Sequence, residues 1–426
     1  MLNKFIFGSL VALIAITAIP YGTVEPWWKA AFVCAVFAIC IVAIVEALMS
    51  RASGIEGGSI LLPMLALTAL AFLQTLSISA DPFQTRFFAL QLLALTTFLA
   101  LLYRYANTER RVRVLIYAIL AIAVASAVFG ILRQTAQHQT GFVLPLLRQN
   151  QGYGQFINKN HFAYLMEMAF GLGLGIILGG GIKRDRVMIY VALLLPIWTG
   201  LVLANSRGGI LAMLAQVGVA ALIVLSVSHD GEPAARSLPL KAILIVVLCA
   251  GVVAGTFWVG GDRLATNFEA ATREFNTGPS SNLEGASRNE IWRASLKMFA
   301  AHPMLGAGLG GYWIGITAYH DASGLMTPQE AHNDYLELLS SAGLAGLAIG
   351  VWFAVAVVRR VRTNLTGDSG FKRAVRLGAV LGLAGVAAHS LVDFGLHIMV
   401  NAVVFITLIA LATTDFGSQN TQIDAR

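Results

Sequence analysis

Long apolar stretches separated by short polar segments run through most of this chain. A helix needs roughly 20 apolar residues to cross a bilayer, and it must satisfy its own backbone hydrogen bonds there. Stretches of about this length that are bounded by charged residues therefore predict transmembrane helices. There are twelve of them, at about residues 5–20, 30–49, 60–79, 87–103, 113–132, 161–181, 187–204, 209–228, 240–259, 332–358, 374–391 and 396–415.

The composition agrees with this pattern. Hydrophobic residues make up 57% of the 426 residues and charged residues only 12%, more apolar surface than a soluble core of this size could bury. The first stretch ends at Pro20 without a small-residue cleavage site, so we expect a retained helix and not a signal peptide. The predicted fold class is an all-α polytopic membrane protein with about 12 transmembrane helices.

One segment, residues 260–331, has the polar composition of a soluble protein. Within it, Arg288–Ala301 has apolar residues at helical spacing and predicts an amphipathic helix, which the glycine-rich Pro303–Tyr312 segment ends. The expected organisation is N-terminal transmembrane helices (1–132), further transmembrane helices with polar motifs at one face (133–259), a large loop (260–331) and C-terminal transmembrane helices (332–426).

The basic residues predict the orientation. With the N-terminus in the cytoplasm, 18 of the 29 lysines and arginines fall on the cytoplasmic side, as the positive-inside rule requires. The C-terminus is then also cytoplasmic, and the large loop is extracytoplasmic. The net charge of +7 is thus mostly a topology signal and gives little support to nucleic-acid binding. Cys34, Cys40 and Cys249 all lie in predicted spans, so neither a disulfide framework nor a thiolate metal site is expected.

Polar motifs gather in the predicted outer loops. Asn205–Gly209 (NSRGG) is either a tight turn with a snorkelling arginine or an anion site, in which Arg207 and a helix N-terminus would bind a phosphate. In Gly154–Ala163, the side chains of Asn158, Lys159, Asn160 and His161 could cap a helix or could bind sugar hydroxyls and phosphate oxygens.

Two further motifs contain histidine beside carboxylates. In Ala331–Leu339 (AHNDYLELL), His332 lies within a turn of Asp334 and Glu337, a suitable setting for a general base that a carboxylate orients, although a structural histidine is the commoner case. In His389–His397 (HSLVDFGLH), Asp393 lies at membrane depth, where we expect it to pair with an arginine.

The order of these motifs resembles the O-antigen ligase and polymerase superfamily of bacterial membrane glycosyltransferases. The resemblance rests on GQFINKNHFA, NSRGG, an Arg-xxx-Trp helix before PMLGAGLGGY, AHNDYLELLSSAGLAGL and HSLVDF, and spans roughly residues 150–400. It implies metal-independent, inverting transfer of a glycan from an undecaprenyl-diphosphate carrier to a glycan or lipid acceptor at the periplasmic face of the inner membrane.

The resemblance also implies roles for individual residues. Arg207 and Arg288 would hold the diphosphate, and His332 would deprotonate the acceptor hydroxyl or assist the leaving group. Paired arginines suit this chemistry, because cleavage of a glycosyl phosphate develops negative charge that they stabilise. No Asp-x-Asp motif offers an obvious metal site, and no cofactor is expected. The expected substrate-binding residues are Asn158, Lys159, Asn160, His161, Arg293, Asp334, His389 and Asp393.

Several activities stay open. The HSLVDFGLHIMVNA segment resembles the polymerase branch, which extends lipid-linked repeat units, whereas a ligase transfers finished glycan to lipid A core. A flippase or other transporter also needs many spans and internal arginines, but the polar motifs gather at one face and do not line a path across the membrane. A scaffold that contacts other polysaccharide assembly proteins would not require Arg207, Arg288 and His332 to act together.

Overall fold

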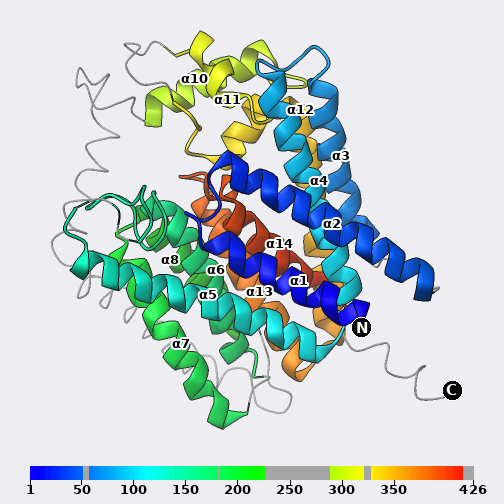
Figure 1. Cartoon of the computed structure of the whole chain (residues 1–426), viewed down its shortest axis with the longest axis vertical. Helices are drawn as coiled ribbons and strands as arrows, with labels where there is room; N and C mark the ends of the chain where they lie inside the picture. Colours follow the sequence, from blue (N-terminus) through cyan, green and yellow to red (C-terminus); the bar gives the residue numbers. More distant parts are fainter. Residues whose placement is uncertain are drawn as a thin grey trace.

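The computed structural model describes residues 1–50, 57–139, 141, 143–180, 183–226, 288–320 and 328–415. The regular structure of these residues is helical (Figure 1). The longer helices are α1 (Leu2–Ala18), α2 (Pro26–Ser50), α3 (Gly58–Gln74), α4 (Pro82–Tyr105), α5 (Glu109–Ala136), α6 (Lys159–Leu178), α7 (Arg184–Leu203), α8 (Arg207–Ser226), α10 (Arg288–Ala301), α12 (Asp334–Gly367), α13 (Gly370–His389) and α14 (Met399–Thr413). Short helices are α11 (Tyr312–Gly315), η1 (Ile316–Ala318) and η2 (Gly395–His397).

Eleven of the twelve predicted spans coincide with helices, and the span expected at 240–259 lies outside the described residues. By length and apolar composition, six described helices could cross a membrane: α2, α4, α5, α6, α7 and α12. Four more, α1, α3, α8 and α14, are apolar but shorter. The all-α class and the multi-pass character are thus supported. The amphipathic helix predicted at Arg288–Ala301 is present as α10, which is described from Arg288 onward and ends at Ala301, with Ile291 and Met298 on its buried face.

The core centres on α6, most of whose side chains are buried. Helix α13 packs more extensively on α6 than any other described pair of helices does, and also contacts α8 and α14. Glycines allow the two backbones to come close: a Cβ atom on Gly175 would lie 2.4 Å from the Cα of Gly378, and one on Gly171 would lie 2.5 Å from the backbone nitrogen of Gly382. Small residues at helix crossings are typical of membrane bundles, because van der Waals contact drives association there.

Helix α12 is interrupted at Gly343, whose φ of 63° and ψ of −161° are not helical. The loop between α10 and α11 takes over the hydrogen bonds that the break leaves open. The Leu344 amide donates to the Pro303 carbonyl (2.8 Å), and the Gly308 amide donates to the Ser341 carbonyl (2.9 Å). Buried Gln74 of α3 also donates to the Ser341 carbonyl. The glycine-rich turn predicted after α10 therefore attaches α10 and α11 to the first half of α12, and in Figure 1 these elements lie together at one end of the molecule.

Candidate active site

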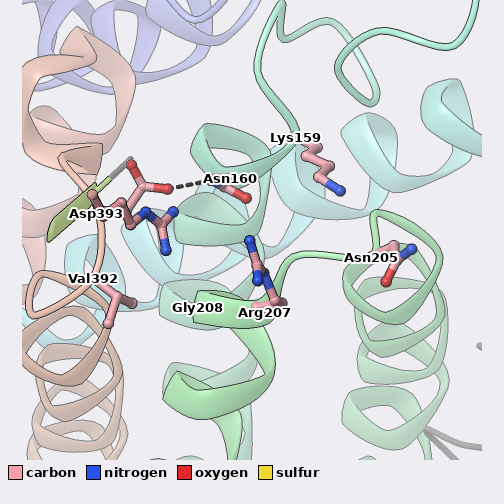
Figure 2. A pocket seen from close by; sticks show the side chains of 8 residues that line it. Lys159, Asn160, Asn205, Arg207, Gly208, Val392 and Asp393 are labelled. Atoms are coloured by element: carbon pink, nitrogen blue, oxygen red, sulfur yellow. Dashed lines mark hydrogen bonds between the residues drawn. The ribbon is translucent and has the colours of Figure 1, made fainter. Parts of the chain in front are cut away.

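A polar pocket lies where helix ends from distant parts of the chain meet (Figure 2). It is formed by the start of α6, the α7–α8 turn, the start of α10 and the segment after α13. Its empty volume, including the part open to solvent, is about 370 Å³. All four segments are ones that the sequence predicted to lie at the outer face. The lining residues are Lys159, Asn160, Asn205, Arg207, Gly208, Arg288, Val392 and Asp393.

Three cationic residues line the pocket, and two of them, Lys159 of α6 and Arg207 of α8, are each the first residue of a helix, while Arg288 is the first described residue of α10. A helix N-terminus carries a partial positive charge and unpaired N–H groups, so a cationic side chain there is unfavourable unless an anion is near. The charges of Lys159 and Arg207 repel each other. In Figure 2, Arg207 extends from the start of α8 toward the start of α6. The arrangement favours binding of a multiply charged anion.

The two turns that place these residues have local causes. The Asn158 side chain caps α6 by accepting a hydrogen bond from the Asn160 amide (2.9 Å). Between α7 and α8, Asn205 has a φ of 52°, and the Ser206 hydroxyl accepts a hydrogen bond from the Gly209 amide (3.2 Å). Each motif therefore forms a helix start and also contributes side chains to the pocket, while its role in binding phosphate or sugar stays a prediction.

A histidine–carboxylate pair borders the pocket. His332 Nδ1 lies 3.2 Å from Oδ1 of Asp393, and Oδ2 of Asp393 accepts a hydrogen bond from the Asn160 side chain. The Phe394 amide also donates to Oδ1 (3.0 Å). Burial alone would raise the pKa of Asp393, but the hydrogen bond with His332 and the charges of nearby histidines outweigh it and lower the pKa to about 2. Asp393 therefore stays ionised and can fix the tautomer of His332.

Beneath the pocket, His389 and Glu167 form a fully buried pair, with His389 Nδ1 2.8 Å from Glu167 Oε2. The imidazole stacks on Tyr164 with 4.0 Å between ring centroids. A Cβ atom on Gly208 would lie only 2.2 Å from His389 Nε2, so glycine is the residue that fits between the pocket and this histidine. His389 supports the floor of the pocket and does not line it.

A second charged cluster lies on the other side of Phe394. His397 Nδ1 is 3.3 Å from Glu330 Oε2, and its Nε2 is 3.3 Å from Glu337 Oε1 and 3.7 Å from Asp334 Oδ1. Burial would lower the pKa of His397, but Glu330 and Glu337 outweigh it and raise the pKa to about 10. Burial likewise would raise the pKa of Glu330, yet His397 lowers it. Within the described chain, Glu330, Glu337 and His397 offer ligand atoms within 4.8 Å of one another, a spacing at which they could hold a metal ion.

Comparison with protein families gives one match, to the family described as O-antigen ligase, over residues 189–351. The matched residues, which we call the O-antigen ligase domain, make up less than half of the chain. The match supports the resemblance stated from the sequence motifs, and the apolar helices agree with a multi-pass membrane protein. No curated protein matches the chain.

The O-antigen ligase domain contains Arg207, Arg288 and His332, whereas Lys159 and Asp393 lie outside the matched residues. The fold brings both sets together. Of the three residues expected to be catalytic, the two arginines line the pocket and His332 adjoins it through Asp393. The pocket is thus built partly by the family domain and partly by flanking helices.

Some expected contacts differ from the structure around this domain. Asp393 was expected to pair with an arginine, but its side chain bonds to His332 and Asn160. Asp334 was a candidate to orient His332, but its carboxylate accepts a hydrogen bond from the Ser390 hydroxyl (2.7 Å) and faces His397. The physical reason is that the two residues point in different directions. His332 lies before α12, whereas Asp334 is the first residue of α12 and its side chain points toward the end of α13.

Four other expected substrate contacts are not among the lining residues, and one of them, Asn158, is the cap of α6 described above. His161 is buried and packs edge-on against Phe394, with 4.9 Å between ring centroids. Arg293 is exposed on α10 and is not among the lining residues. His389 is the buried support described above. The helical periodicity explains Arg293, because five residues rotate an α-helix by about 500°, which places Arg293 about 140° around the helix axis from Arg288.

Sequence reasoning missed Glu167 and Glu330. Glu167 is a single carboxylate in the middle of an apolar span, and such residues need a partner or a function, so the signal was available. Glu330 lies two residues before His332 in a polar loop, where nothing in the local sequence distinguishes it from a solvent-exposed glutamate. Only the fold shows that it meets His397.

Proposed function

We propose that the protein is a bacterial inner-membrane glycosyltransferase that transfers a glycan from an undecaprenyl-diphosphate carrier at the periplasmic face. The observation that carries the proposal is the juxtaposition of three cationic side chains, two of them at helix starts, with the His332–Asp393 pair. The first group of residues suits a diphosphate, and the pair suits proton transfer from an acceptor hydroxyl. The O-antigen ligase domain supports the same class of reaction.

The reaction is a single displacement at the anomeric carbon. Asp393 holds the His332 ring so that its other nitrogen accepts the proton of the acceptor hydroxyl. The hydroxyl oxygen then bonds to the anomeric carbon on the face opposite the diphosphate, which inverts the configuration. The bond from carbon to the diphosphate oxygen breaks, and its electron pair stays on the diphosphate. Arg207, Arg288 and the helix N-termini stabilise this charge, so a metal ion is not required for that purpose. The proton leaves His332 for the diphosphate or for water.

The acceptor decides between two activities. We propose a polymerase, in which the acceptor is the next lipid-linked repeat unit, because the segment His389–Ala402 resembles that branch. A ligase, whose acceptor is lipid A core, is favoured by the description of the matched family. The pocket described here serves the donor in either case.

The first prediction concerns this choice. Purified protein that receives only an undecaprenyl-diphosphate-linked repeat unit should make elongated products, separable by size on a gel. Product that appears only after lipid A core is added would contradict the polymerase and establish the ligase. If neither acceptor yields product from protein shown to be folded, the glycosyltransferase proposal is wrong.

The second prediction concerns orientation. Helix α12 is one of the helices long and apolar enough to cross a membrane, so Ser369 after it and the pocket near its start should lie on opposite faces. In a background without native cysteines, Ala318→Cys, on the pocket side, should react with a membrane-impermeant thiol reagent in intact spheroplasts. Ser369→Cys should react only after lysis. The reverse pattern would place the pocket in the cytoplasm and overturn the periplasmic reaction.

The third prediction concerns the arginines. If they bind the diphosphate through paired N–H groups, lysine retains the charge but loses the fork geometry. We expect Arg207→Lys and Arg288→Lys each to lower the transfer rate by roughly 10² to 10³, the usual cost of one preorganised donor. Arg186→Lys, at the opposite end of α7, is the matched control and should transfer normally. Near-normal rates for both pocket variants would remove the arginines from the mechanism.

A further inference from the structure

His397 lies between carboxylates on both sides of its ring. Glu330 faces Nδ1 at 3.3 Å, while Glu337 and Asp334 face Nε2 at 3.3 and 3.7 Å. Both glutamate side chains are largely buried, and the Ala331 amide fixes Glu337 by donating a hydrogen bond to its Oε2 (2.9 Å). We call these four residues, Glu330, Asp334, Glu337 and His397, the imidazole cage.

The carboxylates on both sides of the His397 ring indicate which cation occupies the imidazole cage. A neutral imidazole donates from one nitrogen only, whereas an imidazolium donates from both. Carboxylates opposite both nitrogens therefore match the protonated ring. A metal ion bound to either nitrogen would have to replace the carboxylate contact already present on that side, so the geometry favours the imidazolium over a metal ion as the charge that holds the carboxylates together.

The cage joins the two segments that carry the histidine–carboxylate pair. Glu330 and Asp334 are the second residues before and after His332, and His397 is the fourth residue after Asp393. Three residues before Asp393, the Ser390 hydroxyl donates a hydrogen bond to Asp334 (2.7 Å). The start of α12 and the α13–α14 segment are thus tied together on both sides of the His332–Asp393 contact.

His332 needs such support because its backbone is strained. Its φ of 50° lies in the left-handed region, which few residues other than glycine adopt. Strained backbone of this kind persists only where the surrounding structure determines it from several sides. Phe394 adds to this support, because its ring packs edge-on against both His332 and His397, with 4.8 and 6.0 Å between ring centroids.

We propose that His397 is a positioning residue, which as an imidazolium inside the cage holds His332 in the orientation needed for proton transfer. This inference rests on the proposed function, since it assumes that His332 takes the acceptor proton. His397 itself does not line the donor pocket, so its loss should change turnover and leave donor binding largely intact.

The test is transfer kinetics on purified His397→Phe, which keeps an aromatic ring beside Phe394 but removes both donors. We expect kcat to fall by roughly 10- to 100-fold, because a misplacement of about 1 Å at a reacting group costs this much. The donor KM should stay within about threefold of that of the unaltered protein, because the cationic residues that hold the donor are unchanged. His397→Arg, whose guanidinium can donate to both sides, should recover part of the lost kcat.

Control variants distinguish a positioning effect of His397 on kcat from a loss of folded protein. Glu330→Gln removes one charge of the imidazole cage and keeps the size of the side chain. It should lower kcat by less than His397→Phe does. His302→Phe, at an exposed histidine in the α10–α11 segment, should behave as the unaltered protein. Thermal midpoints in detergent report folding, and kcat is expressed per folded molecule.

Each outcome decides the question. Folded His397→Phe with normal kcat, or a His397→Arg variant no better than His397→Phe, overturns the positioning role. Loss of unaltered activity in a chelator with recovery in Mn²⁺ or Mg²⁺ overturns it too, because a metal ion would then hold the carboxylates. His332→Ala run alongside distinguishes the two levels: if that variant still transfers, the proposed function fails, and if it is inactive while His397→Phe is active, only this inference fails.

Discussion

The buried carboxylate of Asp393 is the contact on which the arrangement of the site depends. A charge with almost no exposure to water must be compensated by donors, and leaving one unpaired costs several kcal/mol. The donors come from His332 before α12, from Asn160 at the start of α6 and from the Phe394 amide. One side chain thus joins three parts of the bundle, and the pocket keeps its shape as long as Asp393 stays ionised.

The cationic side of the pocket depends on where the helices begin. Lys159 and Arg207 each begin a helix there, where the partial positive charge of the helix N-terminus opposes their own charge, and Arg288 adds a third cationic side chain. The anionic substrate that we propose would interact favourably with all three side chains, and the close approach of His389 requires glycine at position 208 at the start of α8.

Much of this architecture could be predicted from the sequence, and the limits have physical causes. Hydropathy located eleven described helices, and the motifs located the four segments that form the pocket, since chemistry near lipid restricts where polar residues occur. Which carboxylate meets His332 could not be predicted. Asp334 is closer in sequence, but Asp393 is closer in space, because α13 returns the chain to the start of α12. Glu330 and its contact with His397 depend on the same return.

The most direct test of the account measures donor affinity and glycan transfer on the same purified His332→Ala protein. If His332 takes the acceptor proton while the cationic residues of the pocket hold the diphosphate, transfer should fall by roughly 10² to 10⁴, the usual contribution of a general base. Affinity for the undecaprenyl-diphosphate-linked donor should remain close to that of the unaltered protein. Full transfer by His332→Ala, or donor binding lost in parallel with transfer, would contradict the account.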